Sequence, residues 1–380
     1  MRKFICIPDS FKGTMSSSEI SDIMEKSIHS VFPCADVIKI PVADGGEGSV
    51  DAILSAACGD KIFTNVKGPF FEEIEAFYGI IDKGQTAVIE MAACAGLPLV
   101  GENKNPCKAT TYGVGQLIEQ AIFKGCRKII LGLGGSATND AGAGAASALG
   151  VKFFNATGEE FIPVGGTLKD IAHIDISNIL PELKQTEIIT MCDIDNPMFG
   201  ENAAAAVFAP QKGATPEMVS ELDIGLRIIS ERFKTDLKKD VSDISGSGAA
   251  GAMGAGMVAF FDSELKMGIE TVLDTVNFDK LLKDADMVFT GEGKIDAQSI
   301  RGKVVIGVAR RAKASGVPII AVVGDIGDGI GDVYQQGVTA VFSINRVAVD
   351  FETAKTRAKS DLELTMNNIL MLIDKLKSCS

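Results

Sequence analysis

The sequence is poor in histidine, with only 2 among its 380 residues. His29 falls near the end of the first expected helix and His173 in a polar connection, so we expect both on the surface. A hydrolase based on a Ser/His/Asp or Cys/His arrangement is therefore hard to build from this chain. Phosphoryl transfer needs mainly positioning, cations and a metal, so carboxylates and lysines are expected to carry the chemistry.

Three further absences narrow the class of protein. Basic residues number 37 against 50 acidic ones, and the resulting net charge of −13 disfavours nucleic acid and anionic lipid as partners. No apolar run approaches the roughly 20 residues of a membrane span, and residues 3–8 read as a first strand instead of a signal peptide. The 8 cysteines contain no C-x-x-C pair and are expected to be reduced core thiols. We therefore expect a cytoplasmic protein that binds small molecules, and a homo-oligomer is compatible with these features.

Short apolar strands alternate with helical patterns along the chain, which is typical of α/β architecture. A helix is expected to start near Ser16, with Ile20, Ile23, Met24 and Ile28 on one face, and another spans 351–376. Residues 61–82 alternate as antiparallel strands do, which indicates a second domain. We expect residues 63–279 to be inserted into a domain made of 1–62 and 280–380. The expected strands are 3–8, 37–42, 87–91, 128–133, 187–192, 286–290, 318–323 and 340–344.

A glycine-rich stretch, LGLGGSATND at residues 131–140, is the most informative motif. It joins an expected buried strand to a small-residue helix at 141–149. Glycines let the backbone approach a ligand, and the free N–H groups at a helix start favour an anion. The motif predicts a phosphate or nucleotide site, although a turn that only packs the helix on the sheet is the alternative. The candidate nucleotide-binding residues here are Gly134, Gly135, Ser136, Asn139 and Asp140.

Four other clusters repeat one pattern, an apolar strand that ends in a polar loop containing glycine. The carboxyl ends of parallel strands collect at one edge of a sheet, so these loops can converge. In the first loop, Lys12 could hold a phosphate or a carboxylate, or it could be a lysine exposed to solvent. In the second loop, Asp44 and Glu47 could bind a ligand or could cap the following helix. Asp193 follows a strand and suits a Mg²⁺ ligand or a base, whereas Asp195 is a turn residue. The fourth loop, 289–296, lacks the Walker spacing. A weaker cluster at 247–251 reads mainly as tight packing.

Six strings together resemble the bacterial glycerate kinases of the first class. They run in family order over nearly the whole chain, and Lys294 is a departure where the family often has arginine. Lysine keeps the positive charge but cannot donate the paired, bidentate hydrogen bonds of an arginine guanidinium. The strings are PDSFKG at 8–13, PVADGGEG at 41–48, GLGGSATNDAGAG at 132–144, CDIDNP at 192–197, APQKGA at 209–214 and TGEGKIDAQS at 290–299.

The resemblance implies phosphorylation of D-glycerate by ATP with Mg²⁺, on the 2-hydroxyl or alternatively the 3-hydroxyl. It also implies two α/β lobes, one Rossmann-like and one flavodoxin-like, with the active site in the cleft between them. The catalytic candidates are Asp193, Lys12 and Asp44, and the metal candidates are Asp193 and Asp44. Gly291 and Gly293 join the nucleotide-binding set. The candidates for binding glycerate are Asp9, Ser10, Gly45, Gly46, Glu47 and Lys303, with Lys12 or Lys303 facing its carboxylate.

Two other functions stay open on the sequence alone. Gly132, Gly134 and Ala137 also fit the dinucleotide fingerprint G-x-G-x-x-G/A of an NAD-dependent hydroxy-acid dehydrogenase. That fingerprint needs an acid about 20 residues on, at the end of the next strand. Glu159 and Glu160 have the spacing but follow a turn. A non-catalytic nucleotide sensor is the second alternative, and consumption of ATP that depends on glycerate separates all three.

Overall fold

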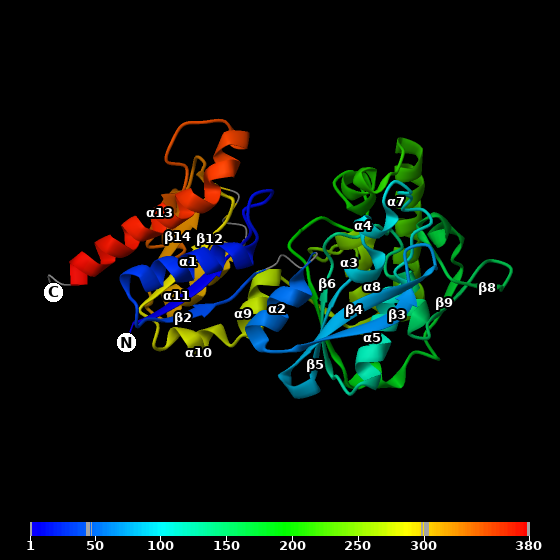
Figure 1. The fold of residues 1–380 in the computed structure, drawn as a ribbon. Coiled ribbons are helices and arrows are strands. Elements are labelled where there is room, and N and C mark those ends of the chain that lie inside the picture. Colours follow the sequence, from blue (N-terminus) through cyan, green and yellow to red (C-terminus); the bar gives the residue numbers. More distant parts are fainter. Residues whose placement is uncertain (1, 43–45, 47, 298, 300–303, 378–380) are drawn as a thin grey trace. The chain divides into compact units, whose positions relative to one another are not determined.

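The computed structural model describes residues 2–42, 46, 48–297, 299 and 304–377, and the chain folds as α/β throughout. It divides into two compact units, which we call terminal and central (Figure 1). The terminal unit comprises Met1–Ala43, Ser55–Ala57 and Ile269–Ser380, and the central unit comprises Asp44–Leu54 and Cys58–Gly268. The α/β class expected from the alternating pattern is confirmed. No helix in the described part of the chain is both long and apolar enough to cross a membrane.

The terminal unit is built on a parallel sheet with the strand order β16-β14-β12-β1-β2. In chain order this is 2-1-3-4-5, a doubly wound arrangement whose direction reverses between β1 and β12. Ligands of such sheets bind outside the carboxyl ends of the strands at this reversal. The strands are β1 (Lys3–Pro8), β2 (Asp36–Lys39), β12 (Met287–Gly291), β14 (Ile319–Val323) and β16 (Ala340–Ser343).

Helices cover this sheet on both faces, which explains why its three inner strands, β12, β14 and β1, are largely apolar and buried, whereas the edge strands β2 and β16 are only partly buried. Helix α1 (Ser17–Val31) lies beside the long helix α13 (Phe351–Lys377), and Ile20 and Met24 of α1 share a core with Leu362 of α13 (Figure 1). The expected start of α1 is confirmed by a capping box of Ser16 and Glu19. The remaining elements of the unit are α9 (Gly268–Thr275), α10 (Phe278–Leu282), β13 (Lys294–Ile295), α11 (Val304–Ala314), β15 (Asp325–Ile326) and α12 (Gly331–Gln335).

The central unit has a mixed sheet with the order β11-β10-β6-β5-β4-β3. Its first four strands in this order are parallel, while β4 pairs antiparallel with both β3 and β5. The antiparallel pair expected over 61–82 is thus confirmed. The strands are β3 (Asp60–Lys67), β4 (Glu73–Ile81), β5 (Thr86–Glu90), β6 (Lys128–Gly132), β10 (Glu187–Met191) and β11 (Glu264–Lys266).

Helices of the central unit pack closely through small residues. A β-carbon at Gly115 would clash with the carbonyl of Ala145, which explains the Gly and Ala content of the segment after β6. The helices are α2 (Ser49–Ala57), α3 (Ala92–Ala95), α4 (Leu97–Val100), α5 (Tyr112–Phe123), α6 (Ala143–Ala148), α7 (Pro216–Arg232) and α8 (Ala249–Phe261). A small antiparallel sheet contains β7 (Lys152–Phe154), β8 (Glu160–Phe161) and β9 (His173–Asp175).

Three local expectations are wrong. The second strand ends at Lys39 and not at residue 42, because the pairing with β1 stops after the N–H of Ile40 donates to the carbonyl of Cys6 at 2.8 Å. Cys58 is exposed in a left-handed conformation at the end of α2, so it is no core thiol. His173 lies in β9 and not in a connection, although both histidines are exposed as expected.

Candidate functional site

The carboxyl ends of β5 and β6 bring two loops of the central unit together. The loop after β6, residues 133–142, is called the glycine loop below. The N–H of Leu97 donates to the carbonyl of Gly135 at 2.8 Å, and the N–H of Ala137 donates to Ala95 at 2.8 Å. The segment after β5 therefore holds the glycine loop in place by backbone hydrogen bonds.

Gly134 and Gly135 form the exposed turn of this loop. Gly135 has φ of 75°, a left-handed conformation that favours glycine, and its surface is exposed. Within the part of the chain that the structure describes, the N–H groups of Gly134 and Gly135 donate to no protein acceptor. Open backbone donors after a strand are the features that bind phosphate oxygens in glycine-rich loops.

Asp140 organises the base of the glycine loop from inside the protein. One of its oxygens, Oδ2, accepts from the N–H and hydroxyl of Thr111, at 2.8 and 2.9 Å, and from the N–H of Gly144 at 3.3 Å. Its other oxygen accepts from the N–H of Gly142 at 3.2 Å. The residue has no exposed surface, and burial raises the pKa of its carboxyl. This carboxylate thus joins the glycine loop to the starts of α5 and α6.

Lys212 lies under the same loop, a position that the sequence analysis did not assign. Its Nζ donates to the hydroxyl of Ser136 and to the carbonyl of Thr138, both at 2.7 Å. Only 2% of the residue is exposed, and burial lowers the pKa of its ammonium to about 7, while attraction from Asp140 opposes the shift. The sequence marked Lys212 only as the lysine of the string APQKGA, at the end of an alanine-rich segment.

Polar side chains in the middle of the glycine loop lack partners. Thr138 Oγ1 and both side-chain atoms of Asn139 are buried without a hydrogen bond to any described residue. Buried polar atoms without partners are costly, and in a native site they point to a ligand or a bound water. Asn139 lies in the same loop as Ser136 and the open N–H groups of Gly134 and Gly135.

The segment at 247–251 packs against this part of the loop. A β-carbon on Gly251 would clash with the carbonyl of Thr138, and the N–H of Ala141 donates to the Gly251 carbonyl at 3.0 Å. Ala250 and Ala252 on either side have φ of 54° and 65°, which is strained for alanine. Strain of this kind collects at functional sites, where surrounding structure maintains it.

Asp193 follows β10 and has an exposed side chain. Its Oδ1 accepts from the N–H of Gly268 at 2.8 Å, at the start of α9. Asp195 is also exposed, two residues further along the same loop. The carboxylate of Asp193 is therefore held in one orientation at the edge of the sheet where the glycine loop begins, because β10 and β6 are parallel neighbours.

Glu90 is a further buried carboxylate that the sequence analysis missed. It ends β5 in register with Gly132, is 2% exposed, and accepts from the N–H of Val50 at 3.2 Å. Burial raises the pKa of its carboxyl. Its signal was an acid within the apolar strand expected at 87–91, whereas Asp193 was singled out because it follows its strand. Gly46 is buried, and its carbonyl accepts from the Ser49 hydroxyl at 2.7 Å. The candidates Asp44, Gly45 and Glu47 lie outside the described residues.

In the terminal unit, the loops after β1 and β12 meet at the point where the strand order changes direction. Asp9 donates its N–H to the carbonyl of Gly291 at 2.8 Å and accepts from the N–H of Ser10 at 2.7 Å. A β-carbon on Gly293 would lie 3.5 Å from the N atom of Lys12. The structure thus brings the candidates Asp9 and Lys12 of the first loop next to the candidates Gly291 and Gly293, which are far from them in sequence. Lys303, the alternative cation, lies outside the described residues.

The side chain of Lys12 is exposed and borders an open pocket of about 450 Å³. Ser10, Gly13 and Thr14 line the same pocket, which adjoins the start of α1. A lysine is a mobile point charge, and the start of a helix favours negative charge. Glu19 of the capping box also lines the pocket, so its lining combines one ammonium with one carboxylate.

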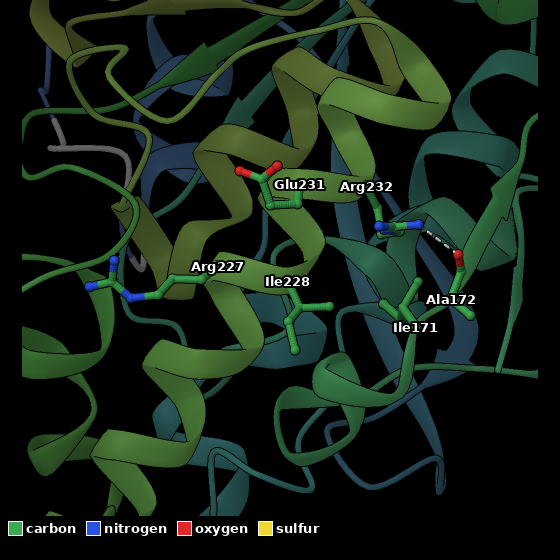
Figure 2. Close-up of a pocket in the computed structure, with 6 residues that line it drawn as sticks. All are labelled: Ile171, Ala172, Arg227, Ile228, Glu231 and Arg232. Atoms are coloured by element: carbon green, nitrogen blue, oxygen red, sulfur yellow. Dashed lines mark hydrogen bonds between the residues drawn. The ribbon is translucent and has the colours of Figure 1, made fainter. Parts of the chain in front are cut away.

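A second open pocket, of about 470 Å³, lies in the central unit between α7 and residues 171–172 (Figure 2). Arg232 points toward the carbonyl of Ala172 and donates to it at 2.9 Å. Arg227 pairs with Asp223 at 2.9 Å and stacks on the ring of Phe199. Its arginines are thus engaged within the protein, and the pocket has no glycine-rich loop. We assign no function to it.

The model of the glycerate kinase family matches residues 4–374. The chain belongs to the glycerate kinase family. The glycerate kinase of Halalkalibacterium halodurans is 44% identical over 98% of each chain, and the glycerate 2-kinase of Escherichia coli is 46% identical over 90% of each. A crystal structure named for glycerate kinase 2 of Salmonella typhimurium LT2 superposes with a TM-score of 0.88 at 40% identity, covering 99% of each chain.

Family membership makes the protein an enzyme, a kinase, and the structure removes the support for a dehydrogenase. Glu160 begins β8, which pairs antiparallel with β7 in the small sheet. The fingerprint requires instead an acid at the end of a strand that continues the parallel sheet. Glu159 and Glu160 therefore cannot fill the ribose-binding position next to the glycine loop.

Proposed function

We propose that this member of the glycerate kinase family transfers the γ-phosphate of ATP to the 2-hydroxyl of D-glycerate, with Mg²⁺, as a kinase of the family's first class. The observation that carries the proposal is the glycine loop, with open N–H groups at Gly134 and Gly135 beside buried polar atoms that lack partners. The name of the relative from Escherichia coli, glycerate 2-kinase, supports the choice of hydroxyl.

The nucleotide is assigned to the glycine loop. Gly134 and Gly135 would donate backbone N–H groups to its phosphates, and Ser136 and Asn139 would add side-chain donors. Asp140 is buried and fully hydrogen-bonded to the protein, so its contribution would be to shape the loop. Gly291 and Gly293 remain candidates for the same ligand.

Glycerate is assigned to the pocket beside Lys12. The substrate is a small anion, and the ammonium of Lys12 would neutralise its carboxylate, a role for which Lys303 is the alternative. Asp9 and Ser10 lie on the same loop and would bind the hydroxyl groups. Gly45, Gly46 and Glu47 stay in the proposed set of substrate-binding residues.

One or two carboxylates of this chain are enough to hold Mg²⁺ together with the phosphates of ATP. The described residues contain no group of three or more metal-binding side chains, and Mg²⁺ in kinases is held by one or two carboxylates plus phosphate oxygens. Asp193 and Asp44 would supply those carboxylates, and the ion would neutralise charge on the transferred group. Asp193 is alternatively the base that accepts the hydroxyl proton of glycerate, with Asp44 next in order.

The test uses purified protein with ATP, Mg²⁺ and D-glycerate. Release of ADP should depend on glycerate, and phosphorus NMR should place the new phosphate on the 2-position. A phosphate on the 3-position would contradict the regiochemistry alone. ATP consumption without dependence on glycerate, or reduction of hydroxypyruvate by NADH, would contradict the kinase proposal.

A further inference from the structure

The cation beneath the glycine loop has an incomplete set of hydrogen bonds. An ammonium carries three N–H donors, and Lys212 uses two of them, on Ser136 and Thr138. The described part of the chain offers no third acceptor. A buried lysine is also costly unless a negative charge compensates it, so this position needs a reason.

Asp140, a residue of the glycine loop itself, is the charged group whose electrostatic attraction acts on the ammonium of Lys212. Its oxygens already accept four hydrogen bonds from Thr111, Gly142 and Gly144. No direct ion pair joins Asp140 to Lys212 among the described residues. The charge of Lys212 is thus only partly compensated by the protein, and an anion on the loop would complete the compensation.

We propose that Lys212 is a positioning residue for the phosphate donor: it fixes Ser136 and Thr138 from inside and gives the glycine loop its positive potential. The inference rests on the proposed function, because it takes ATP as the anion. Because Lys212 is 2% exposed and both of its hydrogen bonds go to the glycine loop, it would act on the nucleotide through the loop. Charge interactions are stronger in such a buried setting than in water, so one ammonium has a large effect.

The chemistry predicts a pH dependence for the use of ATP. The pKa of Lys212 lies at about 7 in the free protein, so the ammonium loses its proton as the pH rises past this value. The loop then loses its positive charge, and kcat/KM for ATP should fall above pH 7. This parameter reports ionisations of the free enzyme.

The experiment compares wild type, Lys212→Met and the matched control Lys104→Met between pH 6 and 9. Lys104 is an exposed lysine whose Cβ lies near Gly213, so the control removes a neighbouring charge outside the loop. In Lys212→Met at pH 6.5 we expect KM for ATP to rise about tenfold, as for one lost charge-assisted contact, with KM for glycerate within about twofold. The inflection near pH 7 should disappear in Lys212→Met and persist in the control. Titration of ATP itself is common to all three proteins.

A second variant covers the case in which Lys212→Met does not fold. Ser136→Ala removes one acceptor from the ammonium, which should lower the inflection by about 0.5 to 1 pH unit. An unmoved inflection in Ser136→Ala, or unchanged KM and pH profile in folded Lys212→Met, would overturn the inference. If wild type fails to phosphorylate glycerate, the proposed function is wrong, and calorimetric titration of ATP into the same variants still tests Lys212.

Discussion

Replacing Asp140 by asparagine tests whether this residue shapes the glycine loop or binds the nucleotide directly. The carboxylate accepts three hydrogen bonds on Oδ2 and one on Oδ1. Asparagine offers one oxygen, which would turn toward the three donors from Thr111 and Gly144. Its NH₂ group would then face the N–H of Gly142, donor against donor, with no exposure to water.

The expected loss of stability follows from these contacts. Two buried donors would be left without partners, at about 1 to 3 kcal/mol each, and the remaining bonds would lose their charge assistance. Removal of a buried charge offsets part of this cost. We therefore expect Asp140→Asn to lower the free energy of unfolding by about 2 to 4 kcal/mol.

Urea unfolding at pH 7, followed by far-ultraviolet circular dichroism, measures the effect, since the chain has no tryptophan. Asp170→Asn is the matched control, because this aspartate is exposed. Thr111→Val should destabilise through the same contacts, and its effect should be less than additive with Asp140→Asn. A loss below about 1 kcal/mol together with a large rise in KM for ATP would refute the reasoning and make Asp140 a direct nucleotide ligand.

Three further predictions concern other residues. Asp193→Asn should lower kcat by about 10²- to 10⁴-fold with a smaller change in KM for glycerate, whereas the control Asp195→Asn should leave kcat unchanged. Partial recovery of activity at high Mg²⁺ would identify Asp193 as a metal ligand. Retention of more than about a tenth of the wild-type kcat would contradict both roles. Between about pH 7, the pKa of Lys212 in the folded protein, and its ordinary pKa of 10.5, Lys212 binds fewer protons in the folded than in the unfolded state. The free energy of unfolding should therefore rise with pH over that range. Denaturant titrations of Lys212→Met should show a weaker dependence of the free energy of unfolding on pH. Ala252→Gly should raise stability by up to about 1 kcal/mol by relieving a left-handed alanine, while Ala249→Gly, which lacks positive φ, should lower it in the same thermal melts.

The structure also changes how the glycine loop should be tested. Gly135 has φ of 75°, so Gly135→Ala would strain the backbone whether or not a ligand binds there. A loss of ATP binding in that variant would not by itself place the nucleotide. Substitutions at Lys212 and Ser136 avoid this difficulty, because they alter contacts and not backbone conformation.

The sequence by itself determined those features that depend on neighbours along the chain. The capping box of Ser16 and Glu19 starts α1 where expected, because both partners lie within one helical turn. Apolar runs located the eight expected strands to within a few residues but gave no signal for the short strands β7, β8, β9, β11, β13 and β15. The glycine-rich string marked the turn at Gly134 and Gly135. In each case a short-range contact or an excluded backbone conformation leaves a local signal.

Only the tertiary structure decided which polar groups meet. Lys212 lies 76 residues from Ser136 along the chain, yet donates to it from the protein interior. Asp140 turns inward to Thr111, and Glu90 reaches the start of α2, although residue type alone suggested ligand binding as readily as internal bonding. Periodicity and spacing specify which face of an element is buried. The partner of a buried charge depends on how strands and loops are packed, and no local pattern records that.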